Sequence, residues 1–84
     1  MATYKILYWQ EIPSQVRAED EADDVTVPMP TEFMESIDRA AARLGLTESD
    51  DYLAQWQWSD ELERPGAVRE VAEAVAAELA SQAR

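Results

Sequence analysis

Carboxylates are the main side chains in this sequence that could do acid–base chemistry. The chain of 84 residues has 18 Asp and Glu but no His and no Cys, which excludes Ser–His–Asp and Cys–His nucleophile systems, cysteine zinc sites and iron–sulfur ligation. Asp60 and Glu61 could in principle form the acid–base pair of a glycosidase. However, a chain this short offers too little volume to enclose a substrate pocket of several hundred Å³. We therefore expect a protein that is not an enzyme.

A run of acidic residues at positions 19–24 could bind a hard cation, because clustered carboxylate oxygens suit calcium or magnesium. The run lacks the Asp-x-Asp-x-Asp-Gly spacing of an EF-hand loop, and it contains no glycine to make the sharp turn. We therefore expect a solvated hairpin tip, with no metal and no cofactor. Binding of a metal or small ligand at this acidic hairpin is an alternative function.

Aromatic side chains are dense for so short a chain, which has three Trp and three Tyr. If helices cover one face of a sheet, the alternation of side chains along a strand places some of these rings on the other face. Such a patch is a natural docking surface, because Trp and Tyr dominate the binding energy of protein interfaces. The alternative is that the rings fill the core. The candidate partner-binding residues are Trp9, Trp56 and Trp58, with Gln10, Gln15 and Arg17 as polar contacts.

The formal net charge of −11 restricts the classes of partner. A strongly negative field repels phosphate backbones and anionic lipid surfaces, so we expect an unidentified protein as partner, with no nucleic acid and no membrane. The apolar run Ile6–Trp9 is far shorter than a signal-peptide core or a membrane span, which favours a cytoplasmic location. An acidic mimic of nucleic acid is a further alternative, but mimicry needs carboxylates spaced over one surface, and the densest group here lies in one loop.

Three segments have the residue pattern of β-strands. Residues 3–10 are β-branched or aromatic at most positions and carry bulky side chains on both faces, which favours a central strand. Pro13 should break or bulge this strand near Ile12 before an extended course resumes. The acidic tip then leads to a return strand at Val25–Val27. We expect the third strand within residues 54–64, where two of the tryptophans fit a period of two.

A first amphipathic helix is indicated by apolar residues at spacings of three and four that end at Leu44. Thr31 is a suitable N-cap for this helix. Gly45 can adopt the left-handed conformation that ends it, and Leu46 occupies the position where a Schellman cap makes its hydrophobic contact.

A second amphipathic helix follows the turn signal Pro65–Gly66 and extends to about residue 82. Between the two helices, Thr47 and Asp50 resemble a capping box, which predicts a short helical turn over 48–54.

The element order β-β-α-β-α favours a single α+β domain over residues 1–84. We expect a small two-layer sandwich, with a mainly antiparallel three-stranded sheet covered on one face by two helices. A helical crossover should place the third strand beside the first, giving the strand order 2-1-3.

The chain resembles the small bacterial family known only as the virulence factor domain. The resemblance covers roughly residues 4–80 and is carried by YWQEIPSQVRAEDE, VPMPTEFMESIDRAAARLGL and YLAQWQW, together with the alanine-rich final helix. This family is similar to the C-terminal part of a longer protein, conserved virulence factor C. The family has no established catalytic residue or ligand that could be carried over to this chain, and the resemblance implies an accessory module that works with larger partners.

Overall fold

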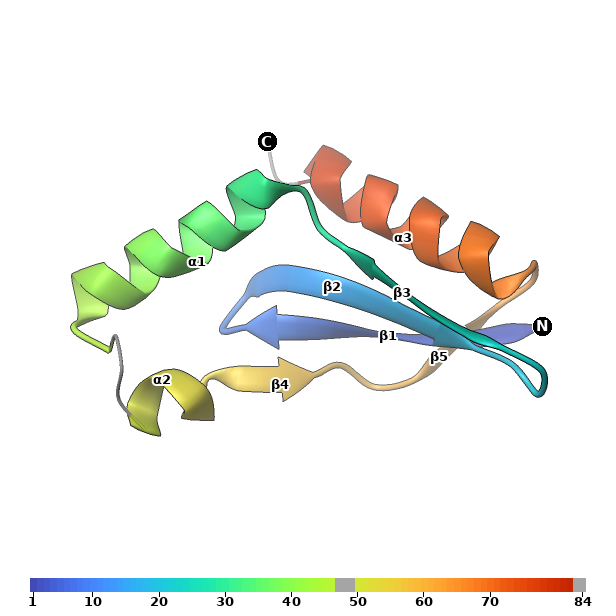
Figure 1. The fold of residues 1–84 in the computed structure, drawn as a ribbon, viewed down its shortest axis with the longest axis horizontal. Coiled ribbons are helices and arrows are strands. Elements are labelled where there is room, and N and C mark those ends of the chain that lie inside the picture. Colours follow the sequence, from blue (N-terminus) through green and yellow to red (C-terminus); the bar gives the residue numbers. More distant parts are fainter. Residues whose placement is uncertain (47–49, 83–84) are drawn as a thin grey trace.

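The computed structural model describes residues 1–46 and 50–82, and within them it contains five strands and three helices (Figure 1). In chain order the elements are β1 (Ala2–Trp9), β2 (Ile12–Glu19), β3 (Asp24–Pro28), α1 (Thr31–Leu44), α2 (Asp50–Ala54), β4 (Trp56–Trp58), β5 (Leu62–Arg64) and α3 (Val68–Gln82). The predicted α+β class is therefore confirmed.

The described strands form one antiparallel sheet in the order β3-β2-β1-β4, and β5 pairs with the N-terminal half of β1. The expected three-stranded sheet of order 2-1-3 is wrong, because the sheet has five strands and the return strand β3 pairs with β2. The central position of β1 is confirmed, since β2 lies on one side of it and β4 and β5 on the other.

The predicted strand order is wrong because the chain makes a turn that the sequence does not mark. The chain reverses at Gln10 and Glu11, so one long expected strand is in fact the hairpin of β1 and β2. Gln10 has a φ of 54°, a left-handed conformation that glycine and asparagine usually supply. The irregularity expected near Pro13 is confirmed, because the pairing register of β1 with β2 shifts between Leu7 and Tyr8.

Two short strands replace the single third strand that we expected. Residues 59–61 interrupt the ladder, and the Ser59 hydroxyl accepts a hydrogen bond from the Ile6 N–H at 2.9 Å. The N–H of Ser59 donates to the Ile6 carbonyl at 2.8 Å. Both short strands nevertheless lie beside β1 as expected, and Trp9 lies directly opposite Trp56.

Helix α1 ends with the cap that its sequence predicts. Gly45 has a φ of 69°, and the N–H groups of Gly45 and Leu46 donate to the carbonyls of Ala42 and Ala41 at 3.1 and 2.9 Å. These two bonds define a Schellman motif. The start of the helix differs from expectation, because Thr31 is the first helical residue and the preceding proline occupies the N-cap position without a side-chain cap.

Helix α3 confirms the second amphipathic helix, and the five-residue α2 occupies most of the expected short turn. Of the expected capping box, Asp50 begins α2, whereas Thr47 lies outside the described residues.

The two long helices, α1 and α3, lie on the same side of the strands (Figure 1). The larger buried cluster joins α3 and the start of α1 to that face of the sheet. Its buried members are Ala2, Ile6, Val16, Ala18, Met29, Phe33, Val68, Val71, Ala72, Val75 and Ala76. A smaller cluster of Trp9, Ile37 and Ala41 closes the end of the β1–β2 hairpin.

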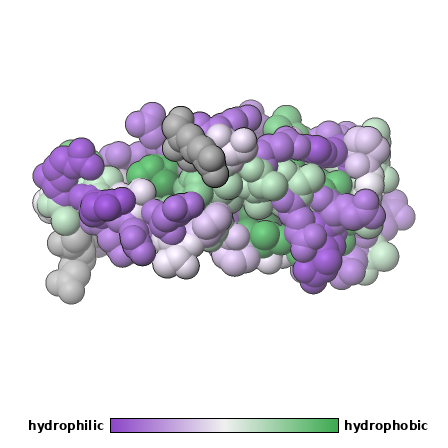
Figure 2. All heavy atoms as spheres, turned by 90° about the horizontal axis from the view of Figure 1, so that it is seen from above, coloured by the Kyte–Doolittle hydropathy of each residue, from purple (hydrophilic) through white to green (hydrophobic). Residues whose placement is uncertain are grey.

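The helix side of the molecule is largely polar on its outer surface. Seen from above, hydrophilic side chains cover both ends of this side, with hydrophobic ones between them (Figure 2). None of the helices in the described part of the chain has the length and apolar character of a membrane-spanning segment.

Candidate functional site

The face of the sheet opposite α3 carries a group of side chains that belong to neither buried cluster. Direct cross-strand partners share a face, and the register pairs Lys5 with Arg17 and Leu7 with both Gln15 and Trp58. We call these five residues the open face. Neither buried cluster of the described residues includes any of the five.

Trp58 is the large aromatic residue of the open face, and 44% of its surface is exposed. The Lys5 ammonium lies 4.7 Å from the centre of the Trp58 ring, which is the geometry of a cation–π contact and is worth about 0.5–1 kcal/mol at an exposed position. This contact holds the indole in place while leaving much of it accessible to a partner.

Arg17 adds a second cation directly opposite Lys5 on the neighbouring strand. Like charges at such a position are destabilising, and the carboxylate of Asp24 on β3 relieves the repulsion because it lies 3.2 Å from the Arg17 guanidinium. The Asp24 side chain is well exposed, and the Arg17 side chain is about one third exposed. The open face therefore combines an aromatic ring, an aliphatic residue, an amide and two cations.

Trp9 does not lie on the surface where we expected a contact residue, because it is completely buried. Its ring packs against Ile37 and Ala41 of α1 and lies 5.6 Å from the ring of Tyr52. The indole N–H donates to the Tyr52 carbonyl at 3.0 Å. Trp9 is buried because α1 and α2 close around the end of the hairpin, and it therefore serves the fold.

Trp56 and Gln10 lie at the same end of the sheet and are also separate from the open face. Trp56 is partly buried against the smaller cluster, and its ring meets the ring of Tyr52 edge-on at 6.1 Å. Gln10 is exposed in the turn, where its amide donates to the Gln55 side chain at 3.4 Å. Of the six predicted residues, the fold thus brings Gln15, Arg17 and Trp58 together.

Lys5 and Leu7 belong to the open face although sequence reasoning did not select them. The signal that identifies them is alternation, since they occupy the face of β1 opposite Tyr4, Ile6 and Tyr8.

The acidic run of residues 19–24 forms a hairpin tip, as expected. One carboxylate oxygen of Asp20 accepts hydrogen bonds from the N–H groups of Ala22 and Asp23, at 2.8 and 2.9 Å. The carboxylate of Asp23 accepts the Asp24 N–H at 3.0 Å. These oxygens hold the turn together in the absence of glycine. Among residues 1–46 and 50–82, no group of three or more acidic side chains is placed to hold a metal ion.

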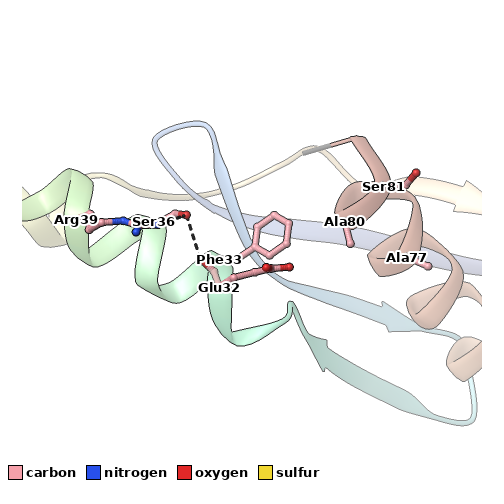
Figure 3. Close-up of a pocket in the computed structure, with 7 residues that line it drawn as sticks. All are labelled: Glu32, Phe33, Ser36, Arg39, Ala77, Ala80 and Ser81. Atoms are coloured by element: carbon pink, nitrogen blue, oxygen red, sulfur yellow. Dashed lines mark hydrogen bonds between the residues drawn. The ribbon is translucent and has the colours of Figure 1, made fainter. Parts of the chain in front are cut away.

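A cavity of about 680 Å³ lies between α1 and α3 (Figure 3). It is lined by Glu32, Phe33, Ser36 and Arg39 of α1 and by Ala77, Ala80 and Ser81 of α3. In Figure 3 the Phe33 ring and the Glu32 carboxylate point toward α3, whereas Arg39 lies farther along α1 beside Ser36. The lining offers one anion, Glu32, and one cation, Arg39, at separate places.

An ion pair fixes β5 to α3. The guanidinium of Arg64 donates two hydrogen bonds to the Glu78 carboxylate, at 3.1 and 2.7 Å. Hydrogen bonding to Arg64 lowers the pKa of Glu78 below its usual value, and the same bond raises the pKa of Arg64. The pair is partly exposed and links β5 to α3.

Comparison with known proteins gives one match. No curated protein and no solved structure shows significant similarity to the chain. A family model described as "Virulence factor" matches residues 7–83, which is nearly the full length of the chain and includes both edge strands and every residue of the open face except Lys5. The chain therefore belongs to the virulence factor family.

Proposed function

We propose that this domain is a non-catalytic accessory module that binds a protein partner through the open face. The observation that carries the proposal is Trp58, an indole that is 44% exposed on β4 and lies under the Lys5 ammonium. Surface tryptophan and arginine are the residue types most enriched among interface hot spots. Arg17 lies on the neighbouring strand of the same face, so the two types occur together.

The composition supports a protein as the partner. A net charge of −11 disfavours approach to nucleic acid or to anionic membranes. We place the domain in the cytoplasm, where a small acidic domain stays soluble while it exposes an aromatic patch.

Site-specific photocrosslinking in the host cell tests this proposal. Trp58 is replaced by p-benzoylphenylalanine in one variant, and Leu44 on α1, which is 53% exposed, is replaced in the control. We expect a covalent adduct with a discrete protein from position 58 and none of the same size from position 44. Equal adducts at both positions, or none at position 58, would contradict the proposal.

A matched pair of alanine variants measures the contribution of the ring. The protein identified by crosslinking should co-purify with the Trp58→Ala variant about tenfold less or more weakly still, as expected for a hot-spot residue. Leu44→Ala should leave the recovery unchanged. Both variants should keep the circular dichroism spectrum of the parent domain.

A further inference from the structure

The outer edge of β4 has main-chain groups that pair with no strand of the described chain. Gln10 donates to the Gln55 carbonyl at 3.1 Å, and Ser59 donates to the Ile6 carbonyl at 2.8 Å. Alternate residues of a strand direct their N–H and C=O groups to opposite sides. The N–H and C=O groups of Trp56 and Trp58 therefore point away from β1. Figure 1 shows no other element beside β4 on that side.

The chain segment that carries this edge is acidic, and the cation nearest to Trp58 is Lys5 of β1, which lies 4.7 Å from the ring. No Lys or Arg occurs between Leu44 and Glu63. Five carboxylates in that segment are exposed on α2, on β5 and between β4 and β5. They are Asp50, Asp51, Asp60, Glu61 and Glu63. These five carboxylates favour a basic partner along this edge.

Exposed apolar side chains accompany the carboxylates. Leu53 of α2, Trp58 of β4 and Leu62 of β5 are 64%, 44% and 49% exposed. An exposed strand edge flanked by apolar residues is the surface that binds an added strand, with main-chain hydrogen bonds giving affinity and alternate side chains giving specificity.

We propose that β4 accepts an extended basic segment of the partner protein as an additional strand of the sheet. The inference rests on the proposed function, because the added strand lies beside Trp58 and one face of it continues the open face. The aliphatic side chains on one face of the segment contact Trp58, and its Lys and Arg side chains meet the carboxylates around the edge.

The edge of β3 is a poorer acceptor of an added strand than β4, and a second copy of the chain is a poorer occupant of the β4 edge than a basic segment. On β3 the main-chain groups of Asp24, Thr26 and Pro28 point away from β2. This follows because the N–H of Met29 donates to the Ser14 carbonyl on the side that faces β2. Pro28 has no N–H to donate, which protects that edge. A second copy would bring two chains of charge −11 together at their acidic edges, which repel one another.

A synthetic peptide provides the first test. The probe is an acetylated and amidated seven-residue peptide of alternating lysine and valine, titrated into the ¹⁵N-labelled domain at low salt. We expect amide shifts centred on Trp56 and Trp58. Methylation of every peptide nitrogen should weaken binding by about tenfold or more, because the main-chain bonds are lost. Equal binding of the methylated peptide, shifts centred elsewhere, or no binding would overturn strand addition.

Two charge-matched variants provide the second test, and each removes three exposed carboxylates. The edge variant is Asp60→Asn/Glu61→Gln/Glu63→Gln. The control variant on the helices is Glu35→Gln/Asp38→Asn/Glu70→Gln. We expect the edge variant to weaken binding of the peptide by about fivefold or more at low salt, and the control by less than about twofold. Equal weakening by both variants would show that only net charge attracts the peptide, which would overturn the inference.

The two proposals fail in different ways. If Trp58→Ala loses the crosslinked partner but the peptide does not bind at β4, strand addition is wrong and the open-face proposal stands. If the peptide binds at β4 as expected but position 58 gives no crosslink, the open-face proposal is wrong and the β4 edge remains the binding surface.

Discussion

Replacing Trp9 tests the distinction between core and surface tryptophans most directly. The Trp9 side chain is completely buried, packs against Ile37, Ala41 and the Tyr52 ring, and donates a hydrogen bond at 3.0 Å. Truncation of a buried aromatic residue to alanine costs about 3–5 kcal/mol. A domain of 84 residues has a total free energy of unfolding of about 4–13 kcal/mol. Trp9→Ala should therefore remove a large fraction of the stability, and in a marginal domain nearly all of it.

Trp9→Phe is the informative variant, because it keeps a ring in the cluster. It loses the indole N–H and part of the packing, for a cost of about 1–3 kcal/mol. This corresponds to a fall in the melting temperature of about 4–8 °C for each kcal/mol. The assay is urea unfolding followed by circular dichroism, with m-values compared to establish that the same transition is measured.

Trp58→Ala is the matched control for this experiment. Because 44% of Trp58 is already exposed, its truncation should cost about 1–2 kcal/mol, including the contact with the Lys5 ammonium. If Trp9→Ala destabilises the domain no more than Trp58→Ala, the assignment of Trp9 to the core and of Trp58 to the surface is refuted.

Three further predictions concern the turn, the cap and the ion pair. Gly45→Ala should lower the free energy of unfolding by about 1 kcal/mol, because a Cβ at a φ of 69° is strained even though no atom lies within 4 Å of it; an unchanged urea midpoint would contradict this. Gln10→Gly should raise the free energy of unfolding by up to about 1 kcal/mol, and with it the urea midpoint, because glycine adopts a φ of 54° without strain. A lower midpoint would show that the lost contact of the Gln10 amide costs more than the relief of backbone strain gains. The Glu78 pKa is lowered in the folded state, so its stabilising contribution is present above the unfolded-state pKa and is lost as pH falls through the folded-state value. In a ¹³C titration Arg64→Met should raise the Glu78 pKa, and an unchanged value would exclude the hydrogen-bonded pair.

The helices could be predicted from sequence because their signals are local. The spacing of apolar residues marks α1 and α3, and Gly45 followed by Leu46 specifies the Schellman cap that the structure contains. The strand order could not be predicted, because it depends on a reversal at Gln10 and Glu11 that lacks the usual turn residues. One unmarked turn converted a single expected strand into β1 and β2 and moved the return strand β3 outward by one position.

The open face was predictable in part. The strand period alone places Lys5 and Leu7 on the face of β1 that α3 does not cover, and the register then adds Gln15, Arg17 and Trp58. Register in a hairpin is fixed by its turn, and the turn at Gln10 and Glu11 lacks the usual turn residues.

The boundary between core and surface on this face lies where α1 and α2 cover the end of the hairpin. Trp9 with Trp56, and Leu7 with Trp58, are successive pairs on one face of the sheet. In the first pair, Trp9 packs against Ile37 and Ala41 of α1 and lies 5.6 Å from the ring of Tyr52 of α2. Neither buried cluster of the described residues includes the second pair, and Trp58 is 44% exposed beside the unpaired edge of β4. Trp9 therefore contributes to stability, and Trp58 is the ring that we propose for recognition.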